Sequence, residues 1–215
     1  MKTKKSKSAK KITKNKINFS KLSPERKRVA IAKDVLQQIK LGRYIASAGS
    51  YIQALMMKDG KERWEMAGED IKRNFTKIKS CEVCAMGACL MSITKFENKL
   101  KFSDVGASME QLHNEKNIEL FSSIFSPEQL LLIEMAFEGD SGGTRVGVDL
   151  FGLSRNDFKK KIAKCGKFYQ KFDLSDKKSS KMSNKEINEY REIAEEKRLT
   201  AIMKNIIKNK GTFKP

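Results

Sequence analysis

Long hydrophobic runs are missing from this chain of 215 residues. The longest, at 130–135, is interrupted by Glu134 and is far shorter than the roughly 20 residues that a membrane-spanning helix needs. The N-terminal lysines are not followed by the apolar stretch of about 7–15 residues that is typical of a secretory signal. We therefore expect a cytoplasmic protein with no membrane partner, whose four cysteines are reduced thiols.

Histidine is almost absent as well, because His113 is the only one. The segment 139–143, GDSGG, coincides with the nucleophile loop of chymotrypsin-like serine proteases, but their triad also needs a histidine held by a carboxylate. His113 lies in no such context. Glu128, Glu134 and Glu138 are scattered along a predicted helix. We predict no catalytic residue and no cofactor, and an enzyme of unknown class stays an alternative.

Positive charge is in excess, and it is concentrated at the two ends of the chain. Residues 1–28 carry twelve lysines and arginines against Glu25 alone, and residues 155–215 carry eighteen against eight acids. The middle, 29–154, is close to neutral, with fifteen basic and seventeen acidic residues. Cationic ends attract polyanions because binding releases condensed counterions, so nucleic acid is the expected partner, with weak sequence specificity. The alternative is a solubilising role.

The sequence predicts a mainly α fold, in which a compact helical domain follows a basic, disordered arm at 1–22. The arm has too few large apolar residues to offset the entropy of ordering it. A helical core is expected at 23–138, a glycine loop, basic helix and linker at 139–183, and a long helix at 184–215 that docks on the core. Within the core, helices are predicted at 65–78 and 81–96, and a short hairpin near 44–57.

Two helix starts carry the same capping signal. Ser23-Pro24-Glu25 and Ser126-Pro127-Glu128 each combine a capping hydroxyl, a proline at the first helical position and an acid near the positive helix end. The apolar run after the second signal predicts a central buried helix. Gly42 is expected to end the first helix in a left-handed conformation.

The cysteines raise the question of a metal site, because zinc and iron–sulfur clusters need clustered thiolates. Cys81, Cys84 and Cys89 lie in a run that is predicted to be helical, and not in two close pairs. We interpret them, together with Cys165, as core residues, since free cysteine is among the most buried residue types. A metal site made of these four residues is kept as a weak alternative.

The stretch 144–166 resembles the helix-turn-helix of Fis-like and response-regulator DNA-binding domains, with Gly152 in the turn and Leu153 as the turn hydrophobe. The resemblance implies that residues opening the second helix face the major groove and that the lysines after them contact phosphates. The alternative is a capped basic helix exposed to solvent. With the arm and the first helix, the predicted nucleic-acid-binding residues are Lys4, Lys5, Lys7, Lys10, Lys11, Arg26, Lys27, Arg28, Ser154, Arg155, Asn156, Lys159, Lys160, Lys161 and Lys164.

Three further segments resemble proteins of tailed bacteriophages and prophages whose function is unknown. They are CEVCAMGACL at 81–90, FSPEQLLLIEMAFE at 125–138 and RLTAIMKNIIKNKGTF at 198–213. The resemblance implies a non-catalytic phage-type accessory protein in the host cytoplasm. Two roles stay open for such a protein, namely binding of nucleic acid through the basic ends and, as the alternative, inhibition of a host defence factor by protein binding.

Overall fold

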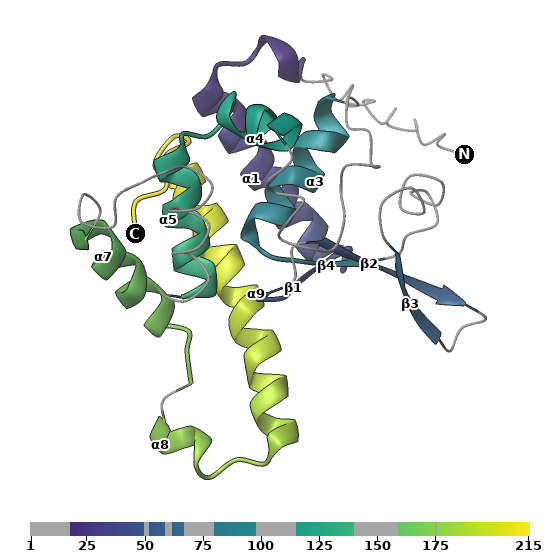
Figure 1. Ribbon diagram of the computed structural model, residues 1–215, viewed down its shortest axis with the longest axis vertical. Coiled ribbons are helices and arrows are strands. Elements are labelled where there is room, and N and C mark those ends of the chain that lie inside the picture. The colour runs from purple at the N-terminus through teal and green to yellow at the C-terminus, as the bar shows by residue number, and fades with distance from the viewer. Residues whose placement is uncertain are drawn as a thin grey trace, which may run out of the picture.

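The computed structural model describes residues 18–49, 52–58, 62–66, 80–97, 115–139, 159–174 and 176–215. Over these residues the protein is mainly helical, as predicted, with a sheet on one side (Figure 1). No helix among them is long and apolar enough to cross a bilayer. In chain order the elements are the 3-10 helix η1 (Phe19–Lys21), α1 (Pro24–Lys40), β1 (Tyr44–Ala46), β2 (Ile52–Lys58), β3 (Glu62–Met66), β4 (Ser80–Val83), α3 (Ala85–Glu97), α4 (Glu115–Ser122), α5 (Pro127–Glu138), α7 (Lys159–Gln170), α8 (Asp176–Ser179) and α9 (Asn184–Lys208).

Both capping signals are confirmed. The hydroxyl of Ser23 accepts a hydrogen bond from the backbone N–H of Arg26, and that of Ser126 accepts one from Gln129. Gly42, just after the end of α1, has a φ of 66°, which is the left-handed conformation expected there.

The predicted helix over 81–96 is wrong in its first turn. Residues 80–83 form β4, in which Cys81 and Val83 are buried and alternate with less buried neighbours, and α3 begins only at Ala85. The helix predicted at 65–78 is wrong at Glu65 and Met66, which belong to β3; its residues 67–79 lie outside the described part. A short apolar run fits a strand and a helix equally well until its pairing partner is known.

The hairpin predicted near 44–57 is also wrong in its pairing. The sheet has the order β1-β4-β2-β3, so β1 pairs in parallel with β4 and not with β2. The hairpin is instead formed by β2 and β3, which pair antiparallel, and β2 pairs antiparallel with β4 on its other side. Parallel pairing of β1 and β4 places the carboxyl ends of both strands at one edge of the sheet.

The described part of the chain begins within the predicted arm. Phe19 in η1 is buried and stacks on Phe96 at the end of α3, with ring centroids 4.6 Å apart. The boundary predicted at residue 22 is therefore too late. Residues 1–17 lie outside the described part.

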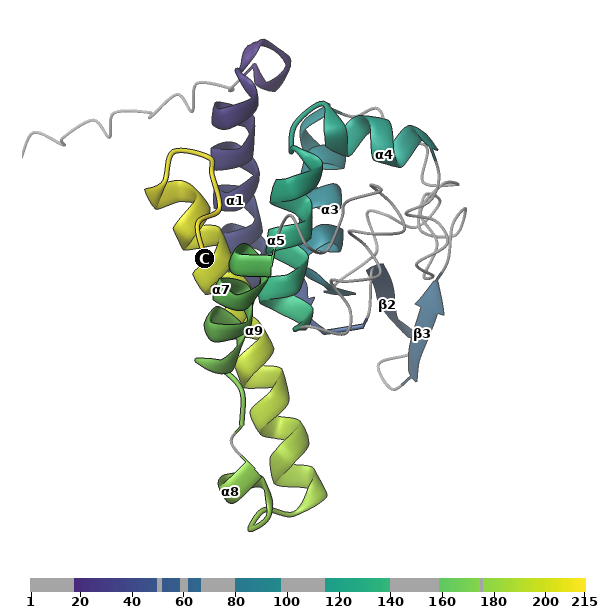
Figure 2. The ribbon, with the colours of Figure 1, turned by 60° about the vertical axis from the view of Figure 1, so that its left-hand side comes forward.

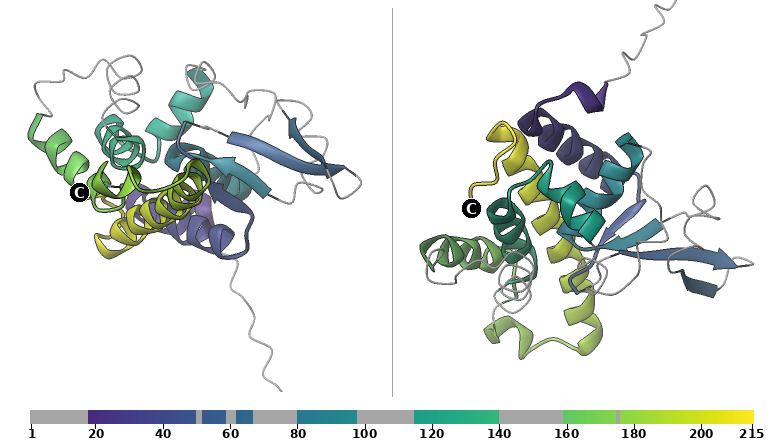
Figure 3. Two further views of the ribbon diagram at one scale, coloured as in Figure 1. Left: turned by 90° about the horizontal axis from the view of Figure 1, so that it is seen from below. Right: turned by 45° about the horizontal axis from the view of Figure 1, so that its top comes forward.

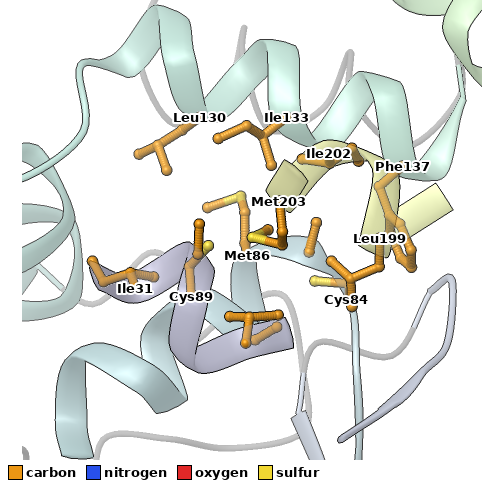
Figure 4. Packing of buried hydrophobic residues seen from close by; sticks show 14 of the residues in the cluster. Ile31, Cys84, Met86, Cys89, Leu130, Ile133, Phe137, Leu199, Ile202 and Met203 are labelled. Carbon is orange, nitrogen blue, oxygen red and sulfur yellow. The ribbon is translucent and has the colours of Figure 1, made fainter. Parts of the chain in front are cut away.

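The core lies between α1, α3, α5 and α9, and α5 is its central buried helix, as predicted. Every residue of α5 from Leu130 to Phe137 is buried, and the helix packs against α3, α7 and α9. Figure 4 shows the α5 side chains meeting Met86 of α3 and Met203 of α9. The C-terminal half of α9 docks beside α1, whereas its N-terminal half and α8 extend away from the body (Figures 1 and 2).

Candidate functional site

One candidate site is the basic surface around α7. The chain carries six lysines and no acid over 159–171, and α7 packs on α5 through Cys165 and Phe168. The thiol of Cys165 donates to the carbonyl oxygen of Leu132 at 3.4 Å. Because this apolar side faces the core, Lys159, Lys160, Lys164 and Lys167 remain exposed.

The C-terminal segment extends this surface. Residues 197–215 carry five lysines and one arginine but no acid. The side-chain amide of Gln129 forms hydrogen bonds with both backbone groups of Phe213. It donates to the carbonyl oxygen of Phe213 at 3.3 Å and accepts from its N–H at 2.6 Å. The ring of Phe213 meets that of Phe168 edge-on, with centroids 5.6 Å apart. Two acid-free basic segments therefore lie side by side.

The start of α1 contacts the C-terminal segment. Arg28 donates from Nε to the carbonyl oxygen of Gly211 at 2.5 Å and from Nη1 to that of Ile124. Gly211 also lies against the backbone of Glu25. The start of α1 and the C-terminal segment are thus in contact, and Figure 3 shows α1 beside α9.

We define the basic surface by six of the exposed cations on these three segments. Lys164 and Lys171 lie one turn before and one turn after Phe168, and the ammonium of Lys171 is 5.6 Å from the centre of its ring. The members of the basic surface are Arg26, Lys164, Lys167, Lys171, Lys210 and Lys214.

The predicted nucleic-acid-binding residues are divided by the structure. Arg26, Lys159, Lys160 and Lys164 are exposed, as binding requires. Lys27 and Arg28 are used within the protein: Lys27 pairs with Glu97 at 3.7 Å, and Arg28 holds the backbone contacts above. Lys161 pairs with Glu128. The residues outside the described part are Lys4, Lys5, Lys7, Lys10, Lys11, Ser154, Arg155 and Asn156, and most of the helix-turn-helix-like stretch lies there too.

A second site was not predicted from the sequence. The Sγ atom of Cys84 and one carboxylate oxygen each of Glu134 and Glu138 all lie within 4.8 Å of one another. Cys84 directly follows β4, and the two glutamates lie one turn apart at the end of α5. Cys84 and Glu134 are each only 3% exposed. We call these three residues the Cys-Glu-Glu cluster.

Burial dominates the electrostatics of this cluster. Burial and, to a smaller extent, the neighbouring carboxyl of Glu138 raise the pKa of Glu134 to about 8, although hydrogen bonds from Cys84 and from the backbone of Met86 act in the opposite direction. Burial likewise raises the pKa of Glu138 and raises that of Cys84 well above its ordinary value. The Oε2 atom of Glu134 has no hydrogen-bond partner.

The surroundings of Glu138 come from three other elements. The N–H of Gly49, in the loop after β1, donates to both of its carboxylate oxygens, at 3.0 and 2.9 Å. Arg198 of α9 lowers the pKa of Glu138, donates to the carbonyl oxygen of Phe137 at 2.6 Å and lies 4.0 Å from the ring centre of Tyr169. Tyr169, Arg198 and Glu195 line a cavity of about 690 Å³. Gly49 and Cys84 follow the carboxyl ends of parallel strands, an edge where ligand sites often lie.

The metal site predicted as a weak alternative from four cysteines is not formed. All four cysteines are free and buried, which confirms the interpretation as core residues. Among the described residues only Cys84 belongs to a group of three ligand atoms close enough to hold an ion, and its companions there are glutamates. A glutamate inside the apolar run 130–137 was the only sequence signal for them.

Comparisons of the chain with protein-family models, curated proteins and solved structures return no match. The resemblances to phage proteins and to a helix-turn-helix therefore stay predictions. Because a fold by itself assigns no function, the proposals below depend on the two sites.

Proposed function

We propose that the protein is a non-catalytic nucleic-acid-binding protein that contacts the phosphate backbone through the basic surface and the N-terminal arm. The observation that carries this proposal is the placement of two acid-free basic segments side by side, at 159–171 and 197–215, held by the contact between Phe168 and Phe213. The resemblance of three segments to phage proteins supports an accessory role in a host cell.

The charge pattern favours backbone contacts over base readout. Five of the six members of the basic surface are lysines, which act as flexible point charges toward phosphates and do not form the planar fork of arginine. Residues 1–17 add eight lysines and precede Asn18, close in sequence to Arg26 at the start of α1. Such a distribution favours weakly specific binding that falls steeply with salt.

The test is fluorescence anisotropy with labelled double-stranded DNA and single-stranded RNA between about 50 and 300 mM salt. The variant K164Q/K167Q/K171Q removes three charges from the basic surface. The matched control K178Q/K181Q/K185Q removes three charges from α8, the turn after it and the start of α9, which extend away from the body of the molecule (Figure 1). All six lysines are exposed, so neither variant disturbs the core.

We expect the basic-surface variant to bind more weakly and to have a shallower salt dependence, by roughly 0.9 in the logarithmic slope for each phosphate that the protein no longer neutralises. The control should stay close to the unsubstituted protein. A truncated chain that starts at Asn18 measures separately how much the N-terminal arm contributes to the binding affinity. Equal losses in the two triple variants would contradict the basic surface as the binding site, and no binding at about 50 mM salt would contradict the function.

A further inference from the structure

We propose that Cys84, Glu134 and Glu138 bind one divalent transition-metal ion of the zinc class. The site is independent of the basic surface, since it shares none of its residues. It combines one sulfur and two carboxylate donors from two elements, β4–α3 and α5, that are far apart in the sequence. A thiolate with carboxylates suits zinc, cobalt or iron better than magnesium or calcium, which prefer oxygen ligands alone.

The spacing of the donor atoms fits an ion. Zinc–sulfur bonds of about 2.3 Å and zinc–oxygen bonds of about 2.0–2.2 Å in a tetrahedron put neighbouring donors roughly 3.3–3.7 Å apart. The three donor atoms of the cluster already lie within 4.8 Å of one another. Binding of an ion would draw the three donor atoms closer together. Three protein ligands leave the fourth position of a tetrahedral ion for water or another group.

The unpartnered oxygen of Glu134 is the second observation that points to a ligand. Its side chain is almost fully buried, and its Oε2 atom has no hydrogen-bond donor. A buried polar atom without a partner destabilises the folded protein, and native proteins contain few of them. A cation bound between Glu134 and Glu138 would give this oxygen a partner and would balance the negative charge of the two carboxylates in their ionised form.

Hydrogen bonds already orient the other two ligands. The N–H of Gly49 fixes the carboxylate of Glu138, and the N–H of Gly87, in the first turn of α3, donates to Sγ of Cys84 at 3.4 Å. Outer contacts of this kind hold ligands in place and are typical of metal sites. Burial raises the pKa of Cys84, and the backbone N–H groups of Gly87 and Met86 lower it by a smaller amount. When the ion binds, the thiol proton and any carboxyl proton leave to solvent.

The cation that faces the cluster does not take the place of a metal. Arg198 lowers the pKa of Glu138, but its Nη1 donates to a backbone carbonyl and its guanidinium lies over the ring of Tyr169. Glu195, which accepts a hydrogen bond from the backbone of Ala48, adds a further acid on this side. Glu195 and Arg198 also line the cavity described above.

The experiment uses the full chain after treatment with a chelator, titrated with Co²⁺ in an absorption spectrometer and with Zn²⁺ in a calorimeter. We expect one ion per chain and a cobalt–thiolate charge-transfer band. C84A should abolish the band. C89A is the matched control, because it removes another buried cysteine of the core that lies outside the cluster and should keep the band.

A second variant distinguishes loss of metal binding from loss of folding. E134Q keeps the shape of the side chain and removes its charge, so it should fold and yet bind Zn²⁺ at least about tenfold more weakly. Circular dichroism confirms that each variant is folded. The proposal would be overturned by the absence of one-to-one binding to the folded chain, by a thiolate band that persists in C84A, or by unchanged affinity in E134Q.

Discussion

The ring of Phe213, close to the C-terminus, lies edge-on to the ring of Phe168 in α7, with centroids 5.6 Å apart. The contact closes the C-terminal segment over the junction of α5 and α7, where Gln129 holds the backbone of Phe213 from the other side. It therefore fixes the position of Lys210 and Lys214 relative to α7, and the basic surface depends on it.

Replacing Phe213 by alanine should destabilise the protein by about 3–5 kcal/mol, because the side chain is only 1% exposed and its loss leaves a cavity. Urea unfolding followed by circular dichroism measures the change. Phe172→Ala is the control: its ring contacts the same Phe168 at 5.6 Å but is half-buried, so the loss should be clearly smaller. Equal losses would contradict the role given to the C-terminal contact.

Gly211→Ala should also destabilise the protein. Gly211 has a φ of 97°, where a side chain is strained by about 1–3 kcal/mol, and an added Cβ would overlap the backbone of Glu25. Gly42→Ala is the control, since Gly42 also has a positive φ, 66°, but open space around it. Thermal unfolding should show a larger loss for Gly211→Ala, and equal losses would mean that the overlap costs nothing.

Local signals in the sequence correctly predicted the starts of α1 and α5. The hydroxyls of Ser23 and Ser126 each accept a hydrogen bond from a backbone N–H only three residues away. The buried face of α9 follows from the helical spacing of its apolar residues, which are Leu199, Ile202, Met203 and Ile206. The sheet was predicted poorly, because the short strand β1 pairs with β4, which lies far along the chain. No periodicity in either segment encodes that pairing.

The residues of the candidate sites were also visible in the sequence, whereas their arrangement in space was not. The lysines of α7 and of the C-terminal segment are visible as charge runs, but their adjacency depends on Phe168, Phe213 and Gln129. The meeting of Cys84 with Glu134 depends on how α3 packs against α5, and composition does not determine that packing. A glutamate within an apolar helical run is a sequence signal for a buried polar site, although it does not identify the partners.

The cysteines should react slowly in the folded protein. Burial raises the pKa of Cys81 to about 11 and of both Cys89 and Cys165 to about 12, and it raises the pKa of Cys84 well above the ordinary value. Because the thiolate is the nucleophile, labelling with a thiol reagent at about pH 8 should be much slower in buffer than in urea, where four thiols should react. A thiol that reacts equally fast in both would contradict this burial.

The start of α9 should show the pH dependence of a capping box. The backbone N–H and hydroxyl of Ser183 both donate to Oε2 of Glu186, each at 2.7 Å, and the N–H of Glu186 donates back to the hydroxyl at 3.3 Å. These bonds lower the pKa of Glu186. A carboxyl whose pKa is lower in the folded state stabilises the helix start above its ordinary pKa, and this contribution is lost as pH falls through the lowered value.

Ser183→Ala should therefore return the pKa of Glu186 toward its ordinary value near 4.5 and speed amide exchange in the first turn of α9 at neutral pH. Carbon-detected NMR titration of the Glu186 carboxyl measures the first effect, and hydrogen exchange measures the second. Ser126→Ala, which removes the cap of α5, is the control and should leave the pKa of Glu186 low. If Ser183→Ala left that pKa unchanged, the hydroxyl of Ser183 would not be the cause of the lowered pKa.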